Sequence, residues 1–292
     1  MRKTTRNSSY KKLVISGNIA ELYEYQYPII MGITRKNSGR GNEKYTDLTT
    51  KIENRKKTQY RARKNVYRII NSNAFQLKKF ITLTFEENLT DIKKANRYFK
   101  TFIQRLNYYL KTINKEKLKY IAVIEFQTRG AIHYHLLCNA PYIQNKTLNE
   151  IWGNGFVKIN NIDNVDNVGA YVTKYMNKDL TDERLQGQKC YLISKNLEKS
   201  IKTTNEKIIS LLLPQFDIKR EYKINYTTEY NGNVVYTQYI LKHDIKNLYN
   251  SIYERQNISN FVILHKLPTK IQSFRKPFAK GLLADKQPTF EL

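Results

Sequence analysis

The sequence predicts an α+β protein in which helices pack on an antiparallel sheet. The prediction rests on the order of the elements over residues 78–159. Three short runs there alternate apolar and polar residues or are apolar throughout, which indicates strands, and the stretch between the first two repeats its apolar residues at helical spacing. A strand, a helix and a strand hairpin open a ferredoxin-like sandwich. We expect a basic N-terminal addition and a β-rich C-terminal addition to this sheet.

The charge of the chain indicates a polyanionic partner. The 292 residues hold 51 Lys and Arg against 25 Asp and Glu, a net charge of +26. Because self-repulsion of this size destabilises the compact state, the excess points to a function. The 23 Tyr and 12 Phe add flat rings on which unpaired bases can stack. We therefore expect a nucleic acid, in preference to a membrane surface or to no polyanion.

Cysteine content and hydropathy indicate the compartment. Cys138 and Cys190 do not suggest a secreted disulfide framework. No apolar run approaches the roughly 20 residues that span a bilayer. We expect a reducing cytoplasm and no membrane partner.

The N-terminal part predicts two strands and a basic helix. A basic tail over residues 1–9 precedes strand-like runs at 12–16 and 22–30. Residues 51–73 contain strong helix formers without Gly or Pro. The helix is either a solvated basic surface or a phosphate-binding one, and we favour DNA contact because few acids balance its cations. The expected contacts are Arg55, Lys56, Lys57, Arg61, Arg63, Lys64 and Arg68.

The middle of the chain predicts the sheet itself. Strands are expected at residues 78–85, 119–126 and 130–137, with a helix at 92–110 after the first. A short helix and a short strand follow. In the C-terminal part, Asn231-Gly232 separates two strand-like runs and is a strong hairpin signal. Residues 189–196 predict one more strand and residues 201–214 a short helix.

Two histidines on one strand are candidate metal ligands. His133 and His135 are two residues apart, so both imidazoles point to the same face, roughly 6–7 Å apart. Neutral imidazole is a common ligand of divalent ions. The alternative is that backbone carbonyls satisfy each histidine.

The neighbouring hairpin strand offers a third ligand. If the turn centres on Arg129, Glu125 pairs with His133, and cross-strand partners share a face. Two nitrogens and one carboxylate suit Mg²⁺ or Mn²⁺. A slip of one residue would turn Glu125 away. The alternative third ligands are Gln127, Glu86 and Glu87.

A predicted helix over residues 167–178 carries Tyr-x-x-Lys twice, as Tyr171 with Lys174 and Tyr175 with Lys178. On a helix these four side chains form one stripe beside an apolar stripe. A tyrosine can act as a covalent nucleophile, and a nearby ammonium attracts phosphate and favours phenolate. The alternative is that the tyrosines only pack against the lysine stems.

The runs FITLTF, IHYHLL and YVTKYMNK, in this order, resemble the three motifs of HUH endonucleases of the rolling-circle replication initiator type. The tandem tyrosines are most similar to the two-tyrosine initiators of small single-stranded DNA phages, the microvirus A and filamentous-phage gene II proteins. Conjugative relaxases of this superfamily place the tyrosine before the histidine pair, whereas here Tyr171 follows His135. The resemblance covers about residues 75–200. Tyr134 stands where many members have a bulky aliphatic residue.

The resemblance implies an HUH endonuclease fold and a mechanism. His133 and His135 would bind Mg²⁺ or Mn²⁺, Tyr171 and Tyr175 would be nucleophiles, and Lys174 and Lys178 would be the motif lysines. The protein would nick one strand of single-stranded origin DNA, join its 5′ phosphate to tyrosine, and later close the displaced strand. The chain has no GxxxxGK[ST] segment, so a host helicase and a host DNA polymerase are expected in a bacterial cytoplasm.

Three parts of the chain are therefore expected. Residues 1–74 contain the N-terminal strands and the DNA-contacting basic helix, residues 75–200 the HUH nicking-joining domain, and residues 201–292 a C-terminal β-hairpin region whose role the sequence does not indicate. Arg129, in the hairpin turn, is a further expected DNA contact. The alternatives are a single-strand transposase of the same superfamily and a non-enzymatic basic nucleic-acid-binding protein.

Overall fold

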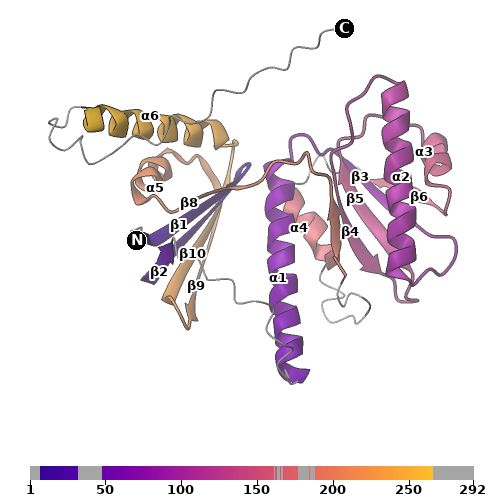
Figure 1. Ribbon diagram of the computed structural model, residues 1–292, viewed down its shortest axis with the longest axis horizontal. Helices are drawn as coiled ribbons and strands as arrows, with labels where there is room; N and C mark the ends of the chain where they lie inside the picture. The colour runs from indigo at the N-terminus through magenta and orange to yellow at the C-terminus, as the bar shows by residue number, and fades with distance from the viewer. Residues whose placement is uncertain are drawn as a thin grey trace, which may run out of the picture. The chain divides into compact units, whose positions relative to one another are not determined.

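Two antiparallel five-stranded sheets form among the residues that the structure describes (Figure 1). The structure is a computed structural model, and it describes residues 7–31, 48–160, 162, 165, 167–176, 184 and 188–265. The chain divides into two compact units, Met1–Lys246 and Asn247–Leu292, and both sheets belong to the first. The predicted α+β class is confirmed.

The first sheet, which we call the histidine sheet, has the predicted order of elements. Its strands, from edge to edge, are β6 (Val157–Asn160), β3 (Lys79–Thr84), β5 (Ile132–Cys138), β4 (Tyr120–Phe126) and β7 (Tyr191–Ile193). Helix α2 (Ile92–Thr112) follows β3, and α3 (Asn145–Trp152) follows β5. The succession β3-α2-β4-β5-α3-β6 with the order β6-β3-β5-β4 is the ferredoxin-like arrangement, to which β7 adds one edge strand.

Helices α2 and α3 cover one face of the histidine sheet. Asp91 begins α2, because its side chain accepts hydrogen bonds from the backbone N–H groups of Lys93 and Lys94. Phe99 of α2 stacks on Tyr134 of β5, with ring centroids 4.6 Å apart. Tyr134 thus faces away from the two histidines that flank it, as its place in the alternation requires.

The opposite face of the histidine sheet is covered by α1 (Leu48–Ser72) and α4 (Val168–Thr173). The two helices lie side by side in Figure 1. Gly169 allows this close approach, because a Cβ atom there would lie 2.6 Å from Nδ2 of Asn71 and 2.7 Å from the backbone oxygen of Tyr67. The backbone N–H of Gly169 donates to Oδ1 of Asn71 at 3.0 Å.

The second sheet, which we call the flanking sheet, combines strands from both ends of the sequence. Its order is β8 (Ile201–Thr203), β1 (Asn7–Ser16), β2 (Ile19–Met31), β10 (Gly232–Leu241) and β9 (Ile218–Thr228). The N-terminal and C-terminal additions of the sequence therefore form one structure. The predicted Asn231-Gly232 hairpin joins β9 to β10, and Gly232 has a φ of +63°.

Two boundaries differ from the sequence predictions. Residues 7–9 were expected in a tail, but they form the start of β1, where Ser9 pairs with Ile29 of β2. Residues 201–203 were expected in a helix, but they pair with β1 as strand β8. The helix of this region, α5 (Glu206–Leu212), starts only after Asn205, whose side chain accepts from the N–H groups of Lys207 and Ile208.

Helix α6 (Lys246–His265) forms the described part of the second unit. Among the described residues, no helix combines the length and the apolar character that crossing a bilayer requires.

Candidate active site

The hairpin of β4 and β5 brings a carboxylate and two imidazoles onto one face. Glu125 is the cross-strand partner of His133, in the register predicted from the turn at Arg129. Nε2 of His135 lies 2.5 Å from Oε2 of Glu125, and Nδ1 of His135 lies 3.2 Å from the hydroxyl of Thr82 on β3. This face is the one that α1 and α4 cover. All three predicted ligands are therefore neighbours under the tyrosine helix.

His133 is buried in a state that suits a ligand. Burial, followed by the neighbouring His135, lowers the pKa of His133 to about 4, so its imidazole is neutral at physiological pH. Within the described part of the chain, no hydrogen-bonding group lies against its buried Nε2 atom. A buried ring nitrogen without a partner costs free energy, and a metal ion is one group that could satisfy it.

The three donors fit a divalent ion in type, but they are not spread around an empty centre. Glu125 contacts His135 directly, and among the described residues no three His, Cys, Asp or Glu side chains are arranged to hold an ion as they stand. An ion would have to replace the Glu125–His135 hydrogen bond. Gln127 has its amide oxygen bonded to Nε of Arg129 at 3.0 Å. Glu86 and Glu87 are exposed after β3.

Helix α4 presents the two tyrosines to this face. The side chain of Asn167 begins the helix by accepting from the N–H of Ala170 at 2.9 Å. After Thr173 the chain tightens into a 3₁₀ turn, Lys174–Met176, whereas the sequence predicted a regular helix to residue 178. Such turns are common at helix ends. Lys178 lies outside the described residues.

A cluster of four rings joins the tyrosines to the histidines. Tyr175 stacks on His135 with ring centroids 3.9 Å apart and an interplanar angle of 24°. Phe80 of β3 lies 5.5 Å from Tyr171 and 5.7 Å from Tyr175, centroid to centroid. Nζ of Lys174 lies 3.9 Å from the centroid of Tyr171 and 5.0 Å from that of Tyr175. Both phenols and one ammonium therefore surround the histidine pair.

The environment of Tyr175 keeps its phenol protonated. Burial, then the hydrogen bond and proximity to Tyr171, and then the Glu125 carboxylate raise the pKa of Tyr175. As a nucleophile it would have to lose its proton as it attacks. The ammonium of Lys174 favours the charged phenolate but does not outweigh these effects in the structure described.

The predicted DNA-contacting cations have two kinds of surroundings. Three of those on α1 are exposed and two are half-buried with part of the side chain in solvent, namely Lys56, Lys57 and Arg61, and Arg55 and Arg63. Arg129 is exposed at the hairpin turn. These six are available to phosphates.

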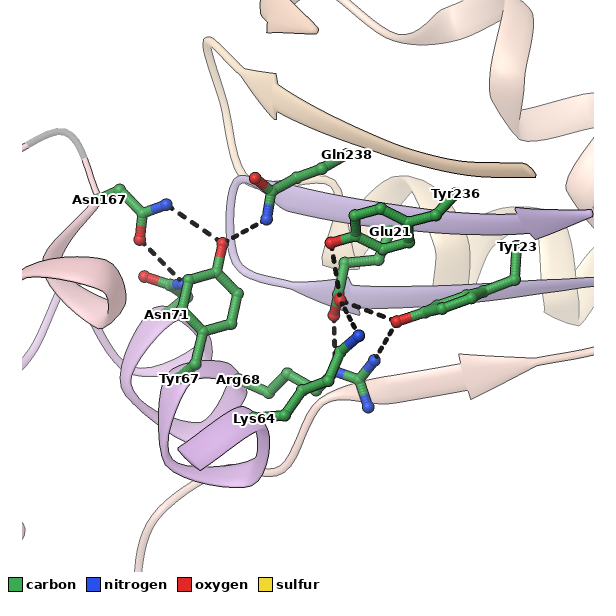
Figure 2. Close-up of polar contacts among 9 residues, drawn as sticks. All are labelled: Glu21, Tyr23, Lys64, Tyr67, Arg68, Asn71, Asn167, Tyr236 and Gln238. Atoms are coloured by element: carbon green, nitrogen blue, oxygen red, sulfur yellow. Dashed lines mark hydrogen bonds and ion pairs between the residues drawn. The ribbon is translucent and has the colours of Figure 1, made fainter. Parts of the chain in front are cut away.

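Lys64 and Arg68 instead neutralise a buried carboxylate of the flanking sheet. Glu21 on β2 is 1% exposed, and its Oε2 accepts from Nε of Arg68 at 2.5 Å (Figure 2). Nζ of Lys64 lies 3.5 Å from Oε1 of Glu21. The hydroxyls of Tyr23 and Tyr236 donate to the same Oε1 at 3.0 and 3.1 Å. We infer a structural role for these two cations, in place of the phosphate contact that the sequence suggested.

A second group of hydrogen bonds continues from α1 to the tyrosine helix. The hydroxyl of Tyr67 accepts from Nδ2 of Asn167 at 3.1 Å and from Nε2 of Gln238 at 2.7 Å (Figure 2). Nδ2 of Asn71 donates to Oδ1 of Asn167 at 3.3 Å. Asn167, which begins α4, is thus held by α1, and through Tyr67 it is linked to β10.

Comparison with known families was made at this point. Residues 78–180 match the family model described as Replication-associated protein ORF2/gene II protein. The match supports a rolling-circle replication initiator family. The matched segment runs from β3 through the tyrosine helix and contains both histidines, Glu125 and both tyrosines. Comparisons with curated proteins and with solved structures give no match.

Sequence reasoning missed two features beside this replication-associated segment. One is Glu21, whose signal was a single acid between Ala20 and Leu22 in an otherwise apolar stretch of strand. The other is Arg184, whose guanidinium lies 3.7 Å from the ring centroid of Phe126 and donates to the backbone oxygen of Gly130 at 2.8 Å. No local pattern in the sequence marked Arg184.

Proposed function

We propose that the protein is a site-specific single-strand DNA endonuclease and strand transferase of the two-tyrosine HUH type, which initiates and terminates rolling-circle replication of a phage or plasmid. The observation that carries the proposal is the stacking of Tyr175 on His135, with centroids 3.9 Å apart, inside the segment that matches the replication-associated family. A residue that can be a nucleophile thus touches a residue that can be a metal ligand.

The chemistry is a transfer of one phosphodiester bond. The phenolic oxygen of Tyr171 or Tyr175 attacks the phosphorus as its proton leaves, and the bond from phosphorus to the 3′ oxygen breaks. That oxygen takes up a proton and becomes a free 3′ hydroxyl, while the 5′ phosphate stays on the tyrosine. Lys174, whose ammonium lies over both rings, stabilises negative charge on the phosphate. The second tyrosine cuts the regenerated site, and the released 3′ hydroxyl closes the strand.

The same face would hold the cofactor. We propose His133, His135 and Glu125 as the ligands of Mg²⁺ or Mn²⁺, which when bound would polarise the non-bridging oxygens of the scissile phosphate. The unpartnered Nε2 of His133 and the neutral state of its ring support this assignment. Thr82 orients His135 from the other side of its ring by the contact at Nδ1.

The partners follow from the proposed reaction. The substrate is single-stranded origin DNA, contacted by the six cations on α1 and at the hairpin turn that reach solvent. A host helicase and a host DNA polymerase, in the cytoplasm of a bacterium, would unwind the duplex and extend the 3′ end.

The test is covalent capture of the substrate. Purified protein is incubated with 5′- and 3′-labelled single-stranded DNA from its own replicon, with Mn²⁺ or with EDTA. We expect a metal-dependent adduct on the 5′ side of the cut. Tyr171→Phe and Tyr175→Phe should each leave the adduct that the other tyrosine forms, and the double variant should form none. An adduct from the double variant would show that another residue is the nucleophile.

The products separate the alternatives. Re-circularisation of the released strand supports a replication initiator, whereas joining to an unrelated target indicates a transposase. DNA binding without any adduct on origin DNA indicates a non-enzymatic binding protein and would refute the proposal.

A further inference from the structure

A cavity of about 510 Å³ lies between α1, α4 and the β9–β10 hairpin, outside the histidine and tyrosine cluster. We propose that this cavity binds single-stranded DNA by stacking unpaired bases on tyrosine rings, and so holds the substrate strand beside the tyrosine helix. The inference rests on the proposed function for the identity of the ligand. Its volume is within the range of about 300–1,000 Å³ that small-molecule sites span, so a nucleotide fits.

The lining is rich in tyrosines that the fold leaves exposed. Tyr222 and Tyr226 alternate on one face of β9 and are 56% and 41% exposed. Tyr60 on α1 is 62% exposed, and Tyr236 on β10 completes the set. Rings of this kind stack on every base, whatever the sequence. Because β9 is an edge strand, exposed rings along it would favour aggregation unless they served a ligand.

The charges of the lining suit a phosphate backbone. Arg63 and Lys64 line the cavity, and Glu21 is the acid among the lining residues. Glu21 is already neutralised by Arg68, at 2.5 Å, and by Lys64. The carboxylate therefore does not repel a phosphate, and Arg63, which is half-buried, leaves the surface positive.

The cavity also borders the tyrosine helix. Ala170 and Thr173 of α4 belong to its lining, and they precede Tyr171 and Lys174 in the chain. Bases held here would bring the strand to α4 without occupying the histidine face. The expected consequence of losing the cavity is weaker substrate binding with an unchanged chemical step.

Binding is measured without chemistry, by fluorescence anisotropy of fluorescein-labelled oligothymidylate in EDTA with the full-length protein. The test variant is Tyr222→Thr with Tyr226→Thr, which keeps strand-forming residues but removes both rings. Stacking is worth about 1–3 kcal/mol per base, so we expect affinity to fall roughly tenfold or more. Tyr222→Phe with Tyr226→Phe keeps the rings and should bind as the unmodified protein does.

Matched controls separate the cavity from general surface effects. Tyr230→Thr removes an 82% exposed ring from the turn of the same hairpin and should leave affinity unchanged. Arg63→Gln should reduce the slope of log affinity against log salt by about 0.7, the value for one phosphate of a single strand. Circular dichroism establishes that each variant is folded, and the Phe variant serves if the Thr variant is not.

The outcomes are decisive. Equal binding by the Thr variant and the unmodified protein, or no oligothymidylate binding by the unmodified protein, would overturn the proposal. Weaker binding by the Phe variant would overturn stacking, and stronger competition by oligouridylate than by oligothymidylate would overturn DNA as the ligand. If the Thr variant binds weakly and still forms the covalent adduct at saturating DNA, both proposals stand. Weak binding with no adduct from the unmodified protein on origin DNA keeps the cavity and refutes the nuclease.

Discussion

Replacing Glu21 by Gln tests whether the flanking sheet is attached to α1 by a buried ion pair. The carboxylate is 1% exposed and receives four groups, from Arg68, Lys64, Tyr23 and Tyr236. A Gln amide has a similar shape but one acceptor oxygen, so an N–H₂ group would meet either the guanidinium or the two hydroxyls. The variant removes the countercharge and places donors against donors.

The size of the effect follows from burial. Removing one partner of a buried ion pair costs about 3–5 kcal/mol, because the remaining charge stays buried without compensation. Glu24 lies on the same strand and pairs with Lys11 at 2.9 Å, with side chains 36% and 39% exposed. Exposed pairs contribute about 0–1 kcal/mol. Glu21→Gln should therefore lower the free energy of unfolding by at least about 2 kcal/mol more than Glu24→Gln does.

The assay is urea unfolding at pH 7, followed by far-ultraviolet circular dichroism on both variants. Burial alone would raise the pKa of Glu21, but the hydrogen bond and charge of Arg68, with the charge of Lys64, hold it below its usual value of 4.5. Its contribution is thus complete above pH 4.5 and is lost as the pH falls through the lower folded-state pKa. The gap between Glu21→Gln and the unmodified protein should narrow there. Equal effects of the two substitutions at pH 7 would refute the buried-pair reasoning.

Two further substitutions test the packing of α4 and the state of the histidine face. Gly169→Ala should destabilise the protein by about 2 kcal/mol in urea, although Ala favours helix, because the new Cβ meets Asn71 and a backbone oxygen; a more stable variant would contradict the close approach of α4 to α1. In EDTA, the stability of the protein should fall as the pH drops from 6.5 to about 4, since His133 takes up its proton more readily when unfolded. His133→Asn should flatten this part of the stability profile, and an unchanged profile would show that His133 is not the group responsible.

The sequence predicted features that depend on near neighbours. The pairing of Glu125 with His133 followed from a turn centred four residues from each, and Gly130, with a φ of +88°, lies in that turn. The alternation in β3 and the helical spacing in α2 were equally local signals. Tyr134 was expected to face away from the histidines, and it packs on Phe99. In each case, the contacts that determine the outcome lie close along the chain or follow from the regular geometry of one element.

Features that depend on distant partners were not predictable in this way. Arg68 looked like a solvent-facing cation because Glu21, its partner, is 47 residues away in another element. Strand β8 has three residues and exists because β1 offers an open edge almost two hundred residues earlier. The 3₁₀ turn after Thr173 is a small change in winding that residue types do not specify. Tertiary context decided all three.

The segment that matches the replication-associated family is not a freestanding module. Val66, Ile69 and Ile70 of α1 lie outside residues 78–180, yet they are buried in the same cluster as Phe80 and Val172. A fragment excised at the family boundaries would expose the inner side of its nucleophile-bearing helix to water and lose the amide that holds Gly169. Grafting this chemistry onto another scaffold therefore requires α1 as part of the transplant, together with the hydroxyl and amide groups that anchor it.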